Sequence, residues 1–308
     1  MAERVRIGTR GSALALRQAE LVAAALRRAW PGLAVELVPI RTSGDKLAHA
    51  NLAQVGGKGL FVKEIEEALL AGRIEAAVHS LKDLPAGVPE GLVLAAFPER
   101  DDPRDVLVSR SGDGLDRLPT GARVGTSSLR RKLQLLARRP DLVVEPIRGN
   151  VETRLRKLDE VAYDGIVLAA AGLRRLGLAP AGATTLGPDE MLPAVGQGTL
   201  AVEVREEDEA TRRLVAALDH AETRAATVAE RTFLAAMGGT CTTPLAAYAR
   251  DEAGRLVLSA FVATPDGSRW LREAETLDAG TPADLGRIVA DRMLARGAAA
   301  IVAAGQAG

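Results

Sequence analysis

The sequence predicts an α/β protein with two lobes, followed by a small α+β C-terminal region that contains an antiparallel sheet. Three observations indicate this class. Short apolar runs alternate with helical patterns through most of the 308 residues. A strand followed by Gly-Thr, a serine and a helix occurs at Gly8-Thr9 and again at Gly125-Thr126. Near the end, two alternating segments flank Pro265-Asp266-Gly267, which is a strong hairpin signal.

The pattern of the first lobe predicts strands at residues 5–8, 34–42, 76–80 and 92–96, and helices at 13–29 and near 61–69. Ser12 is a suitable N-cap for the first helix, and Trp30-Pro31-Gly32 ends it. Residues 43–59 form a long polar segment rich in glycine. Loops of this length are usually lids, binding loops or disordered segments.

A charged segment with two prolines, residues 98–104, predicts a crossing into the second lobe. That lobe should hold helices at 129–138 and 151–158 and strands at 143–147 and 165–169. Residues 193–198 predict a second crossing, after which a strand at 200–204 could return to the first lobe. Two crossings make a hinge plausible.

The third region should hold a helix near 222–237, hairpin strands at 255–264 and 268–276, and a last helix capped by Thr281 with Pro282 at its first position. We therefore expect three domains. Their boundaries are residues 1–98 with 199–217, residues 103–193, and residues 220–308.

Composition argues against several classes of function. Forty basic and forty acidic residues cancel, so no overall field attracts the chain to nucleic acid or anionic membranes. Aromatic residues make up only 3 %, which is too few for base-stacking platforms. No apolar stretch could span a bilayer, and the first residues lead into a strand without an apolar signal core. A single cysteine suits a reducing compartment. We expect a soluble cytoplasmic protein.

Polar loops rich in arginine follow several predicted strands and open helices. In an α/β lobe the ligand binds beyond the carboxyl ends of the strands, toward which helix N-termini point. A cation there opposes the helix dipole unless an anion is held beside it, and guanidinium groups bind carboxylates and phosphates through paired hydrogen bonds. Any single such arginine is more simply a solvated charge. Five together favour an anion site: Arg10, Arg130, Arg131, Arg148 and Arg154.

Asp83 follows the predicted buried strand at 76–80 and lies shortly before a proline. A carboxylate at a strand end facing a cleft is a candidate acid or base. An aspartate at this position is equally suited to forming a turn. His79 and Lys82 nearby suggest a metal or relay site, but the three histidines of the chain are scattered and lack ligand spacing, so we expect no metal.

Cys241 is the only cysteine, and it lies in a run of small residues, Gly238-Gly239-Thr240-Cys241-Thr242-Thr243-Pro244. Lone cysteines are usually buried and behave as small hydrophobic residues. The two glycines before this one and the proline after it indicate a turn that holds the thiol on a partly open loop. Spacing alone leaves both a buried and a reactive thiol open.

Together these motifs resemble the porphobilinogen deaminase (hydroxymethylbilane synthase) family, in order and over nearly the whole chain. The cysteine loop is one matching stretch. The others are IGTRGS from Ile7, GGKGLF from Gly56, AVHSLKD from Ala77, GTSSLRR from Gly125, RGNVETR from Arg148 and PAVGQG from Pro193.

The resemblance implies two lobes like those of type II periplasmic binding proteins and a third domain that carries the cysteine. It implies a deaminating transferase that joins four porphobilinogen molecules head to tail, loses ammonia at each step and releases hydroxymethylbilane for tetrapyrrole (porphyrin and haem) biosynthesis. The family's cofactor is a dipyrromethane made from the same substrate and bound through a thioether, and by position that sulfur belongs to Cys241. We expect a monomer.

The resemblance makes Asp83 the catalytic aspartate. It would deliver a proton to the departing amine, stabilise the azafulvene cation and remove the α-proton after coupling. Cofactor contacts are implied for Cys241, Ser80, Lys82, Asp83, Thr126, Ser127, Ser128, Arg130, Arg131, Arg154 and Gln197. Substrate contacts are implied for Arg10, Ser12, Lys58, Arg148, Asn150, Arg154 and Arg175. The arginines would clamp the acetate and propionate groups of the pyrroles, and residues 43–59 match a mobile lid.

Three positions depart from the family's pattern. Gln54 stands where the family often has lysine, while Thr240 and Ala246 replace glycines on either side of the cysteine. They bear on the lid contacts and on the geometry of the cysteine loop, and not on the reaction.

A competing class is a solute receptor or sensor domain built on the same two lobes. Such a protein needs neither a reactive thiol nor an acid at Asp83, and its intact mass would show an unmodified chain. Zero net charge and few aromatic residues disfavour an RNA-binding protein.

Overall fold

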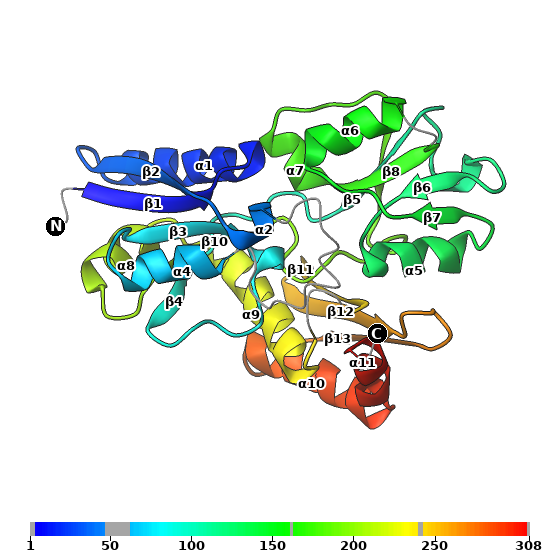
Figure 1. Cartoon of the computed structure of the whole chain (residues 1–308). Coiled ribbons are helices and arrows are strands. Elements are labelled where there is room, and N and C mark those ends of the chain that lie inside the picture. Colours follow the sequence, from blue (N-terminus) through cyan, green and yellow to red (C-terminus); the bar gives the residue numbers. More distant parts are fainter. Residues whose placement is uncertain (1–3, 47–61, 161–162, 240–242, 307–308) are drawn as a thin grey trace. The chain divides into compact units, whose positions relative to one another are not determined.

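The structure, a computed structural model, describes residues 4–46, 62–160, 163–239 and 243–306. It divides into two compact units, each of which uses two separate stretches of the chain (Figure 1). Unit 1 comprises Met1–Asp101 and Gly198–Arg224, and unit 2 comprises Asp102–Gln197 and Ala225–Gly308.

Unit 1 is built on a five-stranded sheet with the strand order β2-β1-β3-β10-β4. The strands are β1 (Arg4–Arg10), β2 (Ala34–Ile40), β3 (Ala76–Ser80), β4 (Leu92–Ala96) and β10 (Leu200–Arg205). β1 runs parallel to β2 and β3, whereas β10 runs antiparallel to both β3 and β4. The strand predicted after the second crossing therefore does join the sheet of the first lobe.

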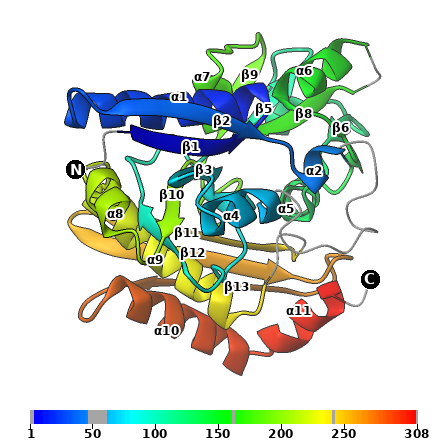
Figure 2. The ribbon, with the colours of Figure 1, turned by 60° about the vertical axis from the view of Figure 1, so that its left-hand side comes forward.

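Helices cover both faces of this sheet (Figure 2). α1 (Ala13–Ala29) and α8 (Glu209–Ala216) share one apolar core with β1, β3 and β10, in which Val22 and Leu214 meet Val78. α4 (Lys63–Leu70) packs on the opposite face, where Ile65 and Leu69 meet Ala77. α1 has the predicted bounds. Of the predicted lid, residues 43–46 form the short helix α2 (Ser43–Lys46), and the remainder lies outside the described residues.

Unit 2 contains a second five-stranded sheet, with the order β7-β6-β8-β5-β9. The strands are β5 (Asp105–Ser109), β6 (Arg123–Gly125), β7 (Val143–Glu145), β8 (Gly165–Ala169) and β9 (Ala183–Leu186). β6 is parallel to β7 and β8, and β5 is antiparallel to β8 and β9. The two sheets therefore have the same order and the same directions, in agreement with the repeated Gly-Thr pattern of the sequence.

The second sheet is also covered on both faces. α5 (Leu129–Arg138), which has the predicted bounds, packs through Leu135 against Val124 and Val167. α6 (Val151–Glu160) and α7 (Ala170–Arg175) pack on the other face, where Leu158 and Leu173 contact the strands. The N-cap serine of α5 and that of α1 occupy equivalent places after equivalent strands.

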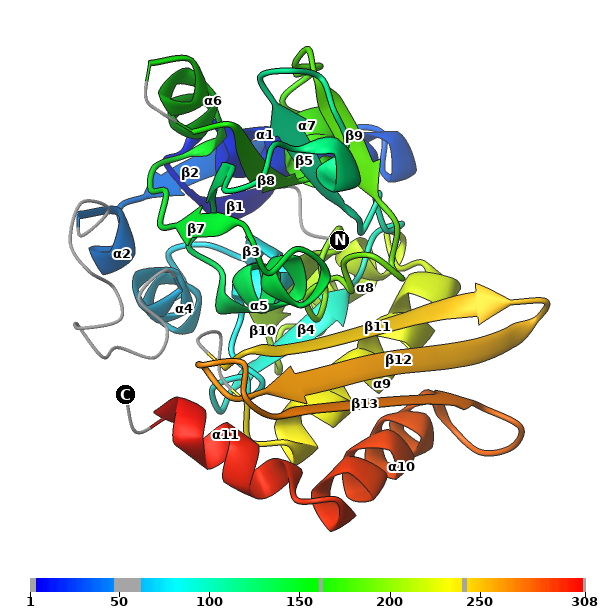
Figure 3. The ribbon, with the colours of Figure 1, turned by 90° about the vertical axis from the view of Figure 1, so that its right-hand side faces the viewer.

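The remainder of unit 2 is an antiparallel sheet of three strands with helices against it (Figure 3). Its elements are β11 (Leu245–Glu252), β12 (Arg255–Ala263), β13 (Trp270–Thr276), α10 (Pro282–Ala295) and α11 (Ala298–Gln306), with α9 (Ala221–Ala236) leading into it. The predicted hairpin joins β12 to β13, and Gly267 has a φ of +75° there. Thr281 and Asp284 form the predicted capping box of α10.

Side chains on the two faces of this sheet have different neighbours. One face shares a core with α9, α10 and α11 that includes Phe233, Leu258 and Val289. On the other face Phe261 packs near Leu133 of α5, so the sheet shares a small core with the second lobe. α11 extends the chain beyond the helix predicted as the last.

None of the helices in the described ranges has the length and apolarity that crossing a membrane would require.

Candidate functional site

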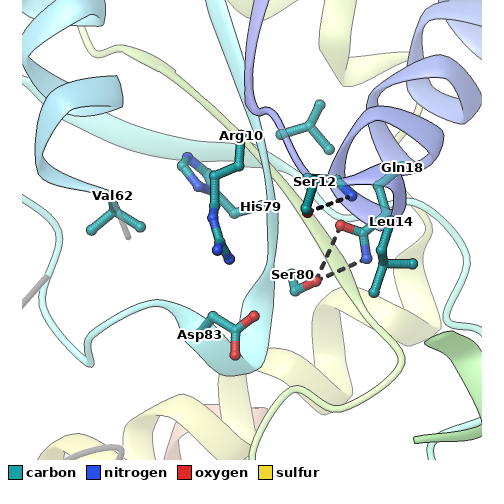
Figure 4. Close-up of a pocket in the computed structure, with 10 residues that line it drawn as sticks. Arg10, Ser12, Leu14, Gln18, Val62, His79, Ser80 and Asp83 are labelled. Carbon is teal, nitrogen blue, oxygen red and sulfur yellow. Dashed lines mark hydrogen bonds between the residues drawn. The ribbon is translucent and has the colours of Figure 1, made fainter. Parts of the chain in front are cut away.

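A small pocket lies at the carboxyl ends of β1 and β3 in unit 1 (Figure 4). Its volume of about 70 Å³ leaves room for a few water-sized groups. β1 and β3 are parallel neighbours, so the residues that follow them emerge at the same edge of the sheet. The lining comprises Arg10, Ser12, Leu14, Ala15, Gln18, Val62, Val78, His79, Ser80 and Asp83.

Local hydrogen bonds fix the two serines of this pocket. Ser12 caps α1, and its hydroxyl accepts a hydrogen bond from the backbone N–H of Ala15 at 3.3 Å. Ser80, the last residue of β3, exchanges hydrogen bonds with the side-chain amide of Gln18, at 2.8 Å to the nitrogen and 3.2 Å to the oxygen. The end of β3 is thereby attached to the first turns of α1.

Asp83 is exposed at the end of a single 3-10 turn, Leu81–Asp83, that directly follows β3. Buried Leu81 begins the turn, and buried Leu84 directly follows it. The N–H of Leu81 donates to the carbonyl oxygen of Thr199 at 3.0 Å, which holds the turn against the strand of the second crossing. Arg10 extends from the end of β1 toward the Asp83 carboxylate (Figure 4). Both side chains line the same pocket.

In unit 2 a buried carboxylate organises the predicted arginines. Asp105, the first residue of β5, is fully buried and forms ion pairs with Arg130 at 2.8 Å and Arg131 at 2.7 Å. The side-chain amide of Gln197 also donates to Asp105, at 2.9 Å. Burial alone would raise the pKa of Asp105, but the two guanidinium groups outweigh it and hold the pKa well below its ordinary value.

This cluster gives Arg130 and Arg131 a protein partner that the sequence analysis did not identify. Their exposed fractions are only 5 and 6 %, so they are far less accessible than a solvated basic face would be. Arg130 also donates to the carbonyl oxygen of Leu192, and Arg131 to that of Val167. Burial lowers the pKa of Arg130, although a guanidinium remains protonated throughout the physiological range.

The predicted hydroxyl residues lie beside this cluster at the end of β6. Ser128 caps α5, Thr126 accepts from the Ser128 N–H at 3.2 Å, and Ser127 donates to the carbonyl oxygen of Ile147 at 2.7 Å. The arrangement after β6 therefore reproduces the one after β1, with a serine cap opening a helix at a strand end. In both lobes the polar residues lie at the carboxyl ends of parallel strands.

The second set of predicted substrate residues lies around the start of α6. The side chain of Asn150 accepts from the N–H of Thr153 at 2.8 Å, which caps the helix. Arg154 donates to the carbonyl oxygen of Gly149 at 2.8 Å, and Lys157 donates to that of Arg148 at 3.0 Å. Arg175 ends α7, which directly follows β8.

The predicted residues thus belong to both units. Unit 1 contains Arg10, Ser12, Ser80, Lys82 and Asp83, and unit 2 contains Thr126, Ser127, Ser128, Arg130, Arg131, Gln197, Arg148, Asn150, Arg154 and Arg175. Cys241 and Lys58 lie outside the described residues, as do the departures Gln54 and Thr240. The third departure, Ala246, is a fully buried residue of β11. Within the described ranges no three acidic, histidine or cysteine side chains gather as metal ligands would.

Comparison with known proteins gives one family. Residues 5–213 match the model of the porphobilinogen deaminase, dipyromethane cofactor binding domain, and residues 225–295 match that of the porphobilinogen deaminase, C-terminal domain. A porphobilinogen deaminase of Syntrophotalea carbinolica is 53 % identical over 97 % of this chain and 95 % of its own. One from Acidithiobacillus ferrooxidans is 52 % identical over 98 % of both chains.

Solved structures of low sequence identity are similar over much of the chain. A lipoprotein of the YaeC family from Enterococcus faecalis is 13 % identical, with a TM-score of 0.43 over 72 % of this chain and 93 % of its own. An amino-acid ABC transporter extracellular-binding protein of Bacillus subtilis is 11 % identical, with a TM-score of 0.43 over 70 % of this chain and 89 % of its own. Similarity at this level supports no functional argument.

Proposed function

The chain belongs to the porphobilinogen deaminase family, and from the geometry of the pocket in unit 1 we propose that Asp83 is its catalytic acid and base. The family reaction joins four porphobilinogen molecules head to tail into hydroxymethylbilane, with release of ammonia, in tetrapyrrole biosynthesis. The chain is a transferase of this kind and contains the family's dipyrromethane cofactor binding domain. These matches favour the enzyme over the alternative of a solute receptor.

Asp83 is suited to the two proton transfers that each coupling needs. The departing amine must receive a proton, and a proton must leave the ring carbon at which the new bond forms. A single carboxyl group can give the first proton and take the second in turn. Asp83 lines the pocket at the end of the 3-10 turn that follows β3, and Arg10 extends toward it (Figure 4).

The chemistry of the donor groups fits a cofactor that carries carboxylates. Each pyrrole ring bears an acetate and a propionate, and the proposed residues supply guanidinium, hydroxyl and amide donors at strand ends in both units. We assign cofactor contacts to Ser80, Lys82, Asp83, Thr126, Ser127, Ser128, Arg130, Arg131, Arg154 and Gln197. We assign substrate contacts to Arg10, Ser12, Lys58, Arg148, Asn150, Arg154 and Arg175. When bound, the dipyrromethane supplies the terminal pyrrole to which the first substrate is joined.

Cys241 is the proposed attachment point of the dipyrromethane, because it is the only thiol in the chain.

We also propose the three-domain division at residues 1–98 with 199–217, 103–193 and 220–308. The topology supports the separation of the second lobe from the three-stranded sheet, since each has a hydrophobic cluster of its own. We further propose a monomer that works in the cytoplasm, which sedimentation velocity and cell fractionation would test. The lone cysteine suits that reducing compartment.

The role of Asp83 is tested by replacing it with asparagine. Asp83→Asn should fold and contain the cofactor, but its turnover should fall by about 10²–10⁴-fold, which is the usual contribution of a general acid–base group. Ammonia release and hydroxymethylbilane formation are measured on enzyme whose cofactor content is known from denaturing mass spectrometry. The matched control is Asp116→Asn, which removes an aspartate that pairs with Arg138 at 2.7 Å on the surface. Turnover of Asp83→Asn close to that of the control would make Asp83 a turn residue and refute the assignment.

A further inference from the structure

A buried histidine–glutamate pair lies beneath the proposed catalytic turn. The Nε2 atom of His79, on β3, is 3.0 Å from Oε2 of Glu203, on β10. The side chains expose only 5 % and 1 % of their surfaces. With Glu203 ionised its oxygens can only accept, so Nε2 of His79 carries the hydrogen of this bond. The role proposed for Asp83 makes no use of either residue.

The pair joins two strands by a diagonal contact. In the antiparallel ladder Glu203 lies opposite Ala77 and His79 lies opposite Ala201, so the bond reaches across the register. It lies on the face covered by α4, because Ala77 belongs to the core that α4 forms. Ser80, the next residue, points to the other face and bonds to Gln18 of α1. The last two residues of β3 are therefore held from opposite sides of the sheet.

One more acidic group belongs to this environment. Glu66 of α4 is half-buried, and its pKa is raised first by burial and then by the Glu203 carboxylate, while His79 lowers it. Glu66 and Glu203, both on the α4 side of β3, therefore affect one another electrostatically. A buried carboxylate such as Glu203 is strongly disfavoured without a partner, so the bond to His79 should persist in the folded state.

The position of the His79–Glu203 pair relative to Asp83 indicates a function for the pair. His79 also lines the pocket that Asp83 and Arg10 line, and only a single 3-10 turn separates β3 from Asp83. A rotation or slip of the strand end would therefore move the carboxylate directly. Misplacement by about 1 Å can lower a catalytic rate by about 10²-fold.

We propose that His79 and Glu203 are positioning residues, which hold the end of β3 so that Asp83 meets the reacting atoms in the correct orientation. The proposal rests on the catalytic role of Asp83. It predicts that loss of the bond lowers kcat and leaves KM for porphobilinogen unchanged, because substrate contacts remain while the acid–base group is displaced.

Two replacements of His79 differ only in reach. Glutamine can place its side-chain nitrogen near the position of Nε2, whereas asparagine is one methylene shorter and cannot reach Glu203. His79→Gln should therefore keep most of the kcat, and His79→Asn should lose roughly 10- to 100-fold. Glu203→Gln, which retains an acceptor, should also remain active. The matched control is His220→Ala, because His220 caps α9 through Thr223 in the same unit and lies outside the pocket.

All variants are compared at equal cofactor content, with thermal unfolding measured in parallel. A purely structural pair would give His79→Gln and His79→Asn the same kcat per cofactor-loaded enzyme, or would raise KM, and either result would overturn the proposal. If His79→Asn fails to fold, the kcat of Glu203→Ala against Glu203→Gln decides the question in the same way.

A double replacement separates this inference from the role of Asp83. If His79 acts through Asp83, the variant with both His79→Asn and Asp83→Asn should be no slower than Asp83→Asn alone in single-turnover measurements. If the rate loss of the double variant equalled the product of the losses of the two single variants, the positioning role would be overturned, while Asp83 would remain catalytic. Full activity of Asp83→Asn itself would instead refute the proposed function.

Discussion

Asp105 is a fully buried charge in unit 2. It is fully buried between Arg130 and Arg131, so its carboxylate compensates two adjacent buried cations. Asparagine has nearly the same shape but no charge. We expect Asp105→Asn to lower the free energy of unfolding by about 3–5 kcal/mol, as breaking a buried ion pair does. Urea unfolding checks this, with exposed Asp116→Asn as the control that should change much less.

The same carboxylate predicts a pH dependence. The pKa of Asp105 is lowered from its ordinary value of 3.8, so the unfolded chain takes up this proton at a higher pH than the folded chain. The carboxylate therefore stabilises the fold fully above that ordinary value, and its contribution is lost as the pH falls below it. The difference in stability between wild type and Asp105→Asn should shrink on acidification from about pH 7 to about pH 3. A constant difference would show that Asp105 is not ionised in the fold.

Cys241 carries the covalent part of the proposed function. Cys241→Ser should give a folded chain without dipyrromethane and without activity, since no second thiol can replace the first. Intact mass and a pyrrole-specific aldehyde colour reaction on the denatured protein measure the attachment. Asp83→Asn, which should still carry the cofactor, is the positive control. A positive colour reaction with the serine variant would show that the attachment site lies elsewhere.

Sequence reasoning located the polar strand-end residues well and the buried acids poorly. Arg10, Ser12 and Asp83 were predictable because each directly follows a strand or opens a helix, which is a local pattern. The partners of Asp105 and Glu203 come from remote parts of the chain, so no spacing in the sequence points to them. An acid at the start of an apolar run, as in Asp105-Val-Leu-Val, is the one signal that could have indicated a buried ion pair.

At the scale of elements, helices α1 and α5 were predicted with their correct bounds because each combines an amphipathic pattern with a serine cap. Strands β5, β9 and β11 and helices α7 and α8 were missed. β5 directly follows the charged crossing, and Asp105 breaks its apolar pattern. β11 contains three alanines within its first five residues, and alanine has a low strand propensity, so the local sequence does not indicate the strand that pairs with β12.

Helices α9 and α10 approach closely at Gly286. A Cβ atom there would lie 2.4 Å from the carbonyl oxygen of Ala229 and 3.0 Å from the backbone nitrogen of Phe233. Because these are backbone atoms, the helices themselves would have to separate. Gly286→Ala should therefore destabilise the chain by about 1–3 kcal/mol, as overpacking does, despite the better helix propensity of alanine.

Gly305 in α11 provides the matched control for that replacement. A Cβ atom at Gly305 would lie 3.5 Å from Cδ of Pro244, which is an ordinary contact. Gly305→Ala should be neutral or stabilising, because alanine is favoured over glycine by about 1 kcal/mol within a helix. If the urea midpoints of the two variants shifted in the same direction and by the same amount, helix propensity, and not the close approach of α9 and α10, would govern the effect at position 286.

At the scale of the whole molecule, the growing product becomes more negative with each added pyrrole, and nearby cationic side chains must balance its charge. The chain has 40 basic and 40 acidic residues, so no general positive field balances the product. Every added pyrrole brings an acetate and a propionate, and unpaired buried charge is strongly disfavoured. Arginines at different strand ends should therefore serve different stages of elongation. Arg148 precedes α6 and Arg175 ends α7, whereas Arg130 and Arg131 already form ion pairs with buried Asp105.

Because the arginines lie in different environments, their replacement should stop the reaction at different stages. Replacing Arg148 or Arg175 with glutamine should leave partly elongated adducts on the protein, because the cofactor forms but later carboxylates lack a partner. Replacing Arg130 or Arg131 also removes an ion-pair partner of Asp105, so among the chains that still fold it should mainly reduce the fraction that carry any cofactor. Denaturing mass spectrometry after brief exposure to porphobilinogen would show a ladder spaced by one pyrrole unit. Arg156→Gln, on the exposed side of α6 where Arg156 pairs with Glu160, should match the wild-type ladder. If all five variants matched it, the arginines would not act in stages, even though the family and its reaction would stand.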